Sequence, residues 1–181
     1  MKLNAKELRK SEPTKADLKK IKRRQIYIIC DNILDTYNIG AIFRLADAVA
    51  ASGVYLCGSS QTPPYHRIAK AAVGTEKWVP WQHFASAKAA IEGIKHQVLG
   101  IKVIAIEQSL KSIDYRLSTC LAGRQAIDYQ LPVAFVVGHE TSGVSQEALR
   151  LCDEIVEIPM FGVNVSLNVM VSLAIVLYRV I

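Results

Sequence analysis

Short apolar runs alternate with segments of helical periodicity from residue 25 onward, and this alternation constrains the fold more than any other feature. The runs are rich in β-branched residues and too short for helices, which favours buried strands. Strands that alternate with helices predict an α/β domain whose mostly parallel sheet is flanked by helices. The expected strands are 25–30, 54–58, 102–107, 131–138 and 154–159, with KWVPW (77–81) a strand interrupted at Pro80.

The helices are predicted from apolar spacing and from composition. One helix is expected over 39–52, where apolar residues recur at helical spacing, and Gly53 is expected to end it. An alanine-rich segment predicts a second helix over 84–97. Further helices are expected within 11–24, over 66–72 and 144–153, and from about Ser166 to the end of the chain.

Three polar loops that contain glycine follow predicted strands. They read DTYNIGAIFR (35–44), GHETSG (138–143) and PMFGVNVSLN (159–168). Ligands of open α/β sheets bind beyond the carboxyl ends of the strands, so these loops are the candidate site. The third loop enters an apolar helix through Asn164, Ser166 and Asn168, and Ser166 is expected both to cap that helix and to face the site.

The positive charge of the chain is concentrated at its N-terminus. Residues 1–24 hold ten Lys/Arg and three Asp/Glu, whereas residues 25–181 hold twelve and thirteen. We therefore divide the chain into a basic arm, 1–24, and one domain, 25–181. Such an arm either binds nucleic acid through phosphates or forms a solvated helix, and charge does not decide between these. The candidate RNA-binding residues in the arm are Lys19, Lys20, Lys22, Arg23 and Arg24.

The cysteines and histidines give no sign of a disulfide framework or a metal site. Cys30, Cys57, Cys120 and Cys152 are far apart, and no CxxC or HxxxH spacing occurs. We expect buried, reduced cysteines and no bound metal. No secretory signal is found, and the longest apolar stretch, 169–176, is well short of the roughly 20 residues that cross a bilayer. A cytoplasmic protein without a membrane partner is expected.

The positions of two charged residues in the candidate loops require an explanation. Arg44 lies in an otherwise apolar helix that Asn38 begins, and its guanidinium suits either a phosphate or an ion pair with Asp47 or another acid. Glu140 would repel phosphate, so a ligand at GHETSG should be poor in phosphate and can be cationic. The alternative is a tight turn in which Glu140 caps a neighbouring backbone. Trp78 and Trp81 are expected to pack in the core rather than to contact RNA.

The three loops together resemble the SpoU (TrmH-type) RNA ribose 2′-O-methyltransferases of the SPOUT superfamily. The motifs read NIGAIFRLADA (38–48), VVGHETSGVS (136–145) and IPMFGVNVSLNV (158–169), and KAAVGTEKWVPW (70–81) is similar to the family's linking segment. The similarity covers about 25–181. It implies a C-terminal trefoil knot, S-adenosylmethionine as cofactor, and a homodimer formed through the knot region and the last helix.

The resemblance also implies roles for individual residues. Gly138, Ile158, Met160 and Leu167 would bind the cofactor, largely through backbone groups, and Ser166 and Asn168 would join them. The catalytic set would be Asn38, Arg44, Glu140, Ser166 and Asn168. The departures from the family pattern are small: GTEKW replaces a Gly-Ala or Gly-Ser segment, and His139 stands where a serine is common.

The reaction implied is methyl transfer to a ribose 2′-hydroxyl of RNA, with tRNA slightly favoured over rRNA because no added RNA-binding domain is seen. Arg44 remains protonated, so we expect it to bind the phosphate on the 3′ side and to stabilise the developing alkoxide. A base-methylating relative and a non-catalytic RNA-binding protein remain open alternatives. A Rossmann-like enzyme is disfavoured because GxGxxG is missing.

Overall fold

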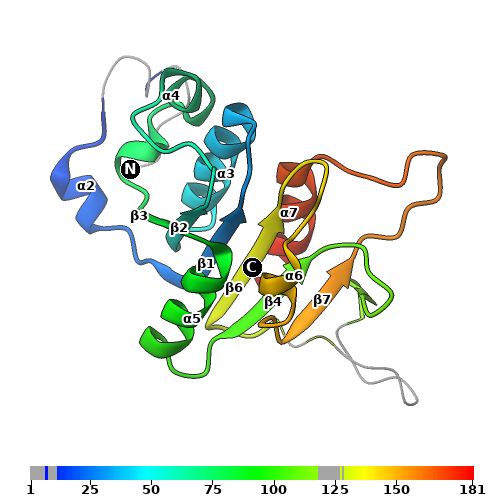
Figure 1. Ribbon diagram of the computed structural model, residues 1–181. Helices are drawn as coiled ribbons and strands as arrows, with labels where there is room; N and C mark the ends of the chain where they lie inside the picture. Colours follow the sequence, from blue (N-terminus) through cyan, green and yellow to red (C-terminus); the bar gives the residue numbers. More distant parts are fainter. Residues whose placement is uncertain (1–6, 8–11, 118–126, 128) are drawn as a thin grey trace.

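The computed structural model describes residues 7, 12–117, 127 and 129–181, and the statements below concern these residues. Its centre is a seven-stranded sheet in the order β3-β2-β1-β6-β4-β7-β5 (Figure 1). All pairings between these strands are parallel, as the alternation of strands and helices predicted. The strands are β1 (Arg24–Asp31), β2 (Ala51–Cys57), β3 (Trp81–Phe84), β4 (Lys102–Ile106), β5 (Ile113–Asp114), β6 (Val133–Gly138) and β7 (Glu154–Glu157).

Helices cover both faces of this sheet (Figure 1). The first face carries α3, α4 and α7, and their apolar side chains share one core with Ile26, Ile28 and Cys30 of β1. The opposite face carries α5 and α6, which pack around Ile29 of the same strand. This alternation along β1 follows from the period of two in a strand. The helices are α2 (Lys15–Lys19), α3 (Thr36–Ala48), α4 (His66–Ala72), α5 (Ala87–Gln97), α6 (Gln146–Leu149) and α7 (Val169–Leu177), with 3₁₀ turns η1 (Thr75–Lys77) and η2 (Tyr178–Val180).

Several predicted boundaries are wrong, each for a local reason. The helix predicted over 39–52 is α3, which begins at Thr36 because the Asp35 side chain accepts the Tyr37 N–H. It ends before Gly53, because Ala50 has a φ of 52° and the chain enters β2 at the next residue. Strand β3 begins after Pro80 rather than on both sides of it. The helix predicted over 144–153 is only Gln146–Leu149.

The sheet order has a topological switch point between β1 and β6. The chain leaves β1 toward α3 on one face and leaves β6 toward α6 on the other. Ligands of open α/β sheets bind where neighbouring strands diverge in this way. All three predicted loops lie at or beside this edge, since they follow β1, β6 and β7.

Other expectations concern isolated residues. Cys30 and Cys57 are buried and Cys152 is partly buried, all as free thiols, while Cys120 lies outside the described residues. Trp78 packs against the larger core, and Trp81 is 37% exposed at the sheet edge. No described helix has the length and hydropathy to cross a membrane. Within the same residues, no group of three His, Cys, Asp or Glu side chains is placed to hold a metal ion.

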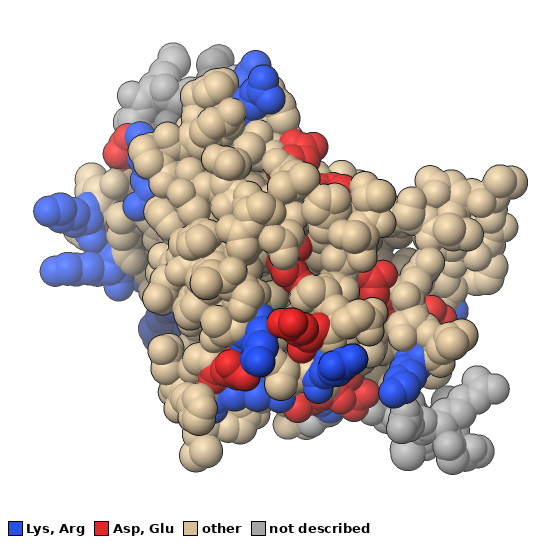
Figure 2. All heavy atoms as spheres, viewed as in Figure 1, with Lys and Arg blue, Asp and Glu red and all other residues tan. Residues whose placement is uncertain are grey.

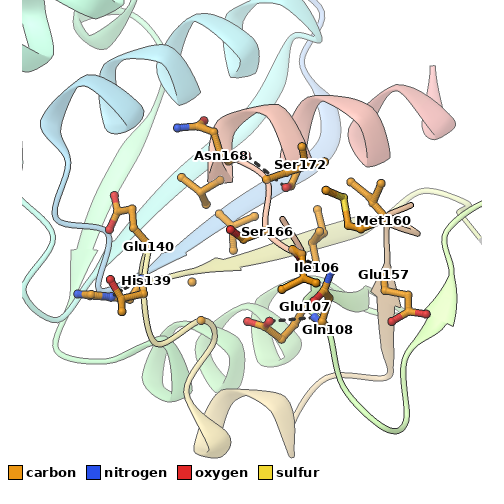
Figure 3. A pocket seen from close by; sticks show the side chains of 18 of the residues that line it. Ile106, Glu107, Gln108, His139, Glu140, Glu157, Met160, Ser166, Asn168 and Ser172 are labelled. Atoms are coloured by element: carbon orange, nitrogen blue, oxygen red, sulfur yellow. Dashed lines mark hydrogen bonds between the residues drawn. The ribbon is translucent and has the colours of Figure 1, made fainter. Parts of the chain in front are cut away.

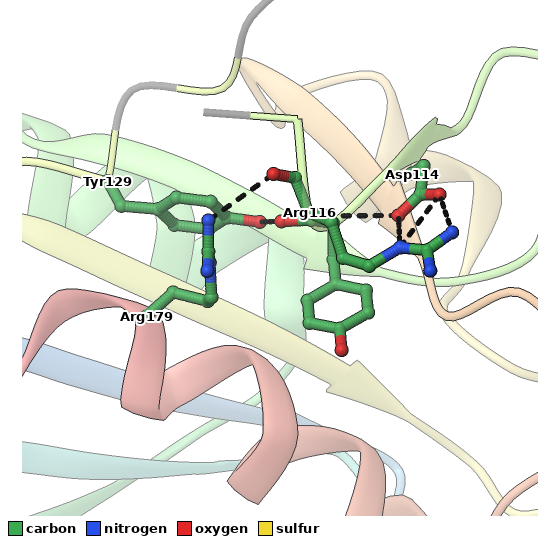
Figure 4. A network of polar contacts seen from close by, with 5 residues as sticks. Asp114, Arg116, Tyr129 and Arg179 are labelled. Atoms are coloured by element: carbon green, nitrogen blue, oxygen red, sulfur yellow. Dashed lines mark hydrogen bonds and ion pairs between the residues drawn. The ribbon is translucent and has the colours of Figure 1, made fainter. Parts of the chain in front are cut away.

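The C-terminus is fastened to the segment that follows β5 (Figure 4). An Arg179 guanidinium N–H donates to the carbonyl of Arg116 at 3.3 Å, and the Tyr129 hydroxyl donates to the carbonyl of Tyr115 at 2.8 Å. At the start of β1, Arg24 donates to the carbonyl of Val180 at 2.6 Å. Hydrogen bonds thus link the end of the chain, after α7, both to the segment that follows β5 and to the start of β1.

Candidate active site

A cavity of about 430 Å³ lies at the carboxyl ends of β4, β6 and β7 (Figure 3). Its floor is apolar where the strands end, and its rim is polar where the loops begin. The cofactor-binding residues predicted from the sequence all line it: Gly138, Ile158, Met160, Ser166, Leu167 and Asn168. A volume in this range and an apolar floor with a few polar groups are typical of small-molecule sites.

Asn38 joins the three loops next to this cavity, through Glu140 and Asn168, which line it. Its Nδ2 donates to Oε1 of Glu140 at 3.1 Å, and its Oδ1 accepts from Nδ2 of Asn168 at 2.9 Å. The Asn38 side chain is only 7% exposed, so both partners are needed to satisfy it. The side-chain amide of Asn38 therefore links Glu140 and Asn168, each of which lies more than a hundred positions away in the chain.

Asn168, and not Ser166, caps the last helix. Oδ1 of Asn168 accepts the N–H groups of Met170 and Val171, whereas the hydroxyl of Ser166 donates to Oδ1 of Asn164 at 3.1 Å. The predicted capping role of Ser166 is wrong because α7 begins three residues later than expected. Ser166 nevertheless lines the cavity, so the other half of that expectation agrees with its position.

Glu140 caps a neighbouring backbone, the alternative that the sequence left open. Its carboxylate accepts the N–H groups of Leu34 at 3.2 Å and Asp35 at 3.0 Å. Partial burial raises the pKa of Glu140, but hydrogen bonds from its own N–H, from Asn38 and from these amides outweigh burial. The net pKa of Glu140 is below its usual value, so the ionised form is favoured.

The lowered pKa of Glu140 predicts a pH-dependent stabilisation. A group with a depressed folded pKa stabilises the fold above its unfolded pKa, roughly 4.3 for glutamate, and less as the pH falls through the folded value. Glu140→Gln should therefore have a lower urea midpoint than the wild type at pH 7, and the gap should narrow toward pH 3. Glu147→Gln, at an exposed position of α6, is the matched control. A gap of equal size at every pH would contradict this assignment.

The turn 139–143 is closed tightly against Glu107, a residue that the sequence analysis missed. His139 and Gly143 exchange backbone hydrogen bonds of 3.1 and 2.9 Å. Oε2 of Glu107 accepts the N–H of Val144 at 2.7 Å. A Cβ atom on Gly138 would lie 2.1 Å from the carbonyl carbon of Gly143, so only glycine fits there. The missed signal is an acidic residue directly after the apolar run of β4.

His139 stands between this cavity and a second one. Its Nδ1 accepts the N–H groups of Thr141 at 3.0 Å and Ser142 at 3.3 Å. In the neutral ring, the proton is therefore on Nε2. The second cavity, of about 360 Å³, is lined by both His139 and Gly143 and extends toward Asp31 and Gln146.

Arg44 does not join this cluster within one chain. It is exposed on α3, and it is not among the residues that line either cavity. It lies six residues after Asn38, and six residues along a helix put the two side chains about 120° apart around its axis, so they leave different faces. No ion pair joins Arg44 to Asp47 or to another described carboxylate, and Oδ1 of Asp47 instead accepts the Trp78 indole N–H.

The five candidate residues of the basic arm fall into two groups. Lys19, Lys20 and Lys22 are exposed. Arg23 and Arg24 are half-buried and donate to backbone carbonyls, Arg23 to those of Ala51 at 3.2 Å and Trp78 at 2.8 Å. The two arginines thus fasten the arm to the domain, a role that the charge count did not indicate.

Comparison with known proteins gives consistent matches. The model of the SpoU rRNA Methylase family matches residues 25–178. The tRNA (guanosine(18)-2′-O)-methyltransferase of Escherichia coli K12 is 32% identical over 159 residues, which cover 87% of this chain and 64% of that enzyme. The enzyme of the same name from Aquifex aeolicus is 29% identical over 165 residues, covering 87% of this chain and 69% of that enzyme. This chain thus spans slightly less than two thirds of the length of the E. coli relative.

Two solved structures show the same fold. The A. aeolicus TrmH/SpoU tRNA modifying enzyme superposes with a TM-score of 0.74 at 27% identity, covering 97% of this chain and 79% of that one. An AdoMet-bound rRNA methyltransferase from Sinorhizobium meliloti also has a TM-score of 0.74, at 28% identity, covering 95% of this chain and 58% of that one.

Proposed function

The chain belongs to the SpoU rRNA methylase family, and from that premise we propose that it transfers a methyl group from S-adenosylmethionine to a ribose 2′-hydroxyl of RNA. The observation that carries the proposal is the link from Glu140 through Asn38 to Asn168, which assembles the three motifs at the rim of one cavity. We favour tRNA as the substrate class, because the E. coli and A. aeolicus relatives are named for tRNA guanosine 18.

The cavity fits S-adenosylmethionine on its own features. Ile106, Val137 and Leu167 give apolar walls for a flat base. Glu107, Glu140 and Glu157 bring carboxylates to its edge, which suits the sulfonium and ammonium cations and disfavours a phosphate-rich nucleotide. The cofactor supplies an activated methyl group, so the protein has to provide orientation and charge stabilisation.

The residues of the chain would divide this work. Asn38, Glu140, Ser166 and Asn168 position the loops and the ribose at the cavity rim. Arg44 binds the phosphate on the 3′ side through paired N–H donors of its guanidinium and stabilises negative charge on the 2′-oxygen. The proton passes to that phosphate or to water, because a guanidinium remains protonated in proteins.

We propose a homodimer with the trefoil knot of the family at its interface. Large apolar side chains stand exposed on the third loop and α7, including Phe161 (90% exposed), Val165 (63%) and Val171 (38%). Figure 2 shows this loop as an uncharged projection at the right of the molecule. Such a patch is typical of an interface. Support for the knot comes from α7, which packs over β4 and β6, and from Gln108, whose amide donates to the carbonyl of Val165 at 2.6 Å.

A dimer would also give the site access to Arg44 from a second copy. An Arg44→Ala chain mixed with an Asn168→Ala chain should then regain methyl transfer that neither has alone. Light scattering should give the mass of two chains for the wild type and of one chain for Phe161→Asp.

We place the protein in the cytoplasm, with its RNA.

The basic arm is proposed to add RNA affinity beside the domain of 25–181. Removing residues 1–22 spares the two anchoring arginines and deletes the exposed lysines of α2 and its flanks. We expect weaker RNA binding with a flatter salt dependence, because fewer phosphates are neutralised, and little change in cofactor binding. Filter binding at several salt concentrations measures both slopes. An unchanged slope would refute an RNA-binding arm.

The decisive test is transfer of tritiated methyl groups from S-adenosylmethionine to total RNA. Nucleoside mass spectrometry of the product separates 2′-O-methyl from base methylation. Comparing modification maps of cells with and without the protein identifies the RNA and the nucleotide. Absence of transfer with retained RNA binding would favour the non-catalytic alternative.

A further inference from the structure

A group of exposed cations lies where α3 and α4 pack together. We name Arg44, Arg67 and Lys70 the α3–α4 basic strip. All three side chains are exposed, and no hydrogen bond or ion pair to them is found among the described residues. Exposed Lys and Arg side chains also stand at the left of Figure 2, where α2 lies, and Figure 1 shows α2 on the same side of the molecule as α4.

The close packing of α3 on α4 sets the geometry of the strip. A Cβ on Gly40 would lie 2.6 Å from both the Cβ of Ala71 and the carbonyl oxygen of Ile68, so the two backbones touch there. Arg44 follows Gly40 by one helical turn, and Arg67 precedes Ala71 by one turn. Residues four apart share a helix face, so both arginines border the seam between the helices. Lys70, three residues after Arg67, extends the row on the solvent side.

The charge of the strip is not compensated locally. Helix α4 has the sequence HRIAKAA, without an acidic residue. The nearest acid along α3, Asp47, accepts the indole N–H of Trp78 at 2.7 Å. Glu76 is only 7% exposed, so its carboxylate cannot form an ion pair with the exposed side chains of the strip. Three unpaired cations on two packed helices therefore present donors that suit the phosphates of an RNA backbone.

We propose that the α3–α4 basic strip binds the RNA backbone, guiding the strand that continues from the phosphate held by Arg44. The inference rests on the proposed function for the position of Arg44 and extends it to Arg67 and Lys70. It assigns the strip to phosphate contacts, which position the RNA without reading its sequence. The neighbouring rings of Tyr65 and His66, with centroids 5.0 Å apart, would flank this path.

The test compares two double variants of equal charge in the full-length chain. Arg67→Ala with Lys70→Ala removes two strip cations. Lys88→Ala with Lys111→Ala removes two exposed lysines from outside the strip and serves as the control. Binding of an unmodified tRNA transcript is measured between about 50 and 200 mM KCl, alongside methyl-transfer kinetics and cofactor affinity.

The strip variant should bind the transcript about tenfold more weakly, and its log–log salt slope should fall by about 1.5, as expected for two lost phosphate contacts. Its loss of kcat/KM should appear in the KM for RNA, with cofactor affinity unchanged. A strip variant that matches the control in slope and KM would overturn the inference. Failure of the proposed function itself would look different, because the wild-type chain would then transfer no methyl group whatever its salt slope.

Discussion

Replacing Arg44 with lysine is expected to lower the single-turnover rate of methyl transfer by about tenfold to a hundredfold. Lysine keeps the positive charge but loses the planar fork that can hold a phosphate while it faces a developing alkoxide. The fold should be unaffected, since Arg44 is exposed and no described carboxylate is paired with it. The rate is measured at saturating cofactor and RNA across a range of pH, so that binding defects do not enter.

The control for this prediction is Arg150→Lys, the same exchange at an exposed position after α6. It should retain the wild-type rate. Full activity of Arg44→Lys would reject the assigned role of the fork and leave only a requirement for charge. A steep rise in rate with pH that appears only in the lysine variant would instead indicate that a neutral amine can act as base there.

The sheet and its loops could be predicted because their signals are local. The strands β1, β4 and β6 are short apolar runs rich in β-branched residues. The period of two along β1 places Ile26 and Ile28 on one face of the sheet and Ile29 on the other. The order of strands, by contrast, depends on contacts between distant segments that no local pattern contains. The seven-stranded order and the late start of β3 after Pro80 had to be observed.

The kinds of residue in the candidate site could be predicted from the sequence, but the hydrogen bonds that connect them could not. Asn38, Glu140 and Asn168 are conspicuous because they are polar residues in the three loops. Nothing in their spacing indicates that one buried amide would bridge the other two. Asn168 caps α7 through Oδ1 and donates to Asn38 through Nδ2, whereas Ser166 lies three residues before the first residue of the helix.

Some contacts of the candidate residues could not be predicted. Arg23 and Arg24 also donate to carbonyls of the folded domain, and their contact with RNA stays a prediction. Glu107 supports the turn of the second motif from a neighbouring strand, a contact between segments that are not adjacent in sequence. Arg44 and Asn38 were predicted to share one catalytic set, and α3 directs their side chains to different faces.

Gly138→Ala is expected to abolish measurable cofactor binding while Gly162→Ala leaves it unchanged. A Cβ at Gly138 would lie 2.1 Å from the carbonyl carbon of Gly143 and 2.2 Å from the nitrogen of Val144. These atoms are backbone, so the turn must open. Opening it breaks the His139–Gly143 pair and pulls Val144 from the carboxylate of Glu107. The melting temperature should also fall, because overpacking of this kind costs about 1 to 3 kcal/mol.

Gly162 provides the matched control, since a Cβ there meets nothing within 4 Å although the residue lies in the third loop beside the cavity. Both variants add one methyl group at a glycine of a candidate motif. Only the methyl group at Gly138 would clash with backbone atoms. Titration calorimetry with S-adenosylmethionine and a thermal melt on the same samples give the two readouts. Equal cofactor affinity in the two variants would mean that the turn 139–143 does not form a wall of the cofactor site, and the cavity would have to serve another ligand.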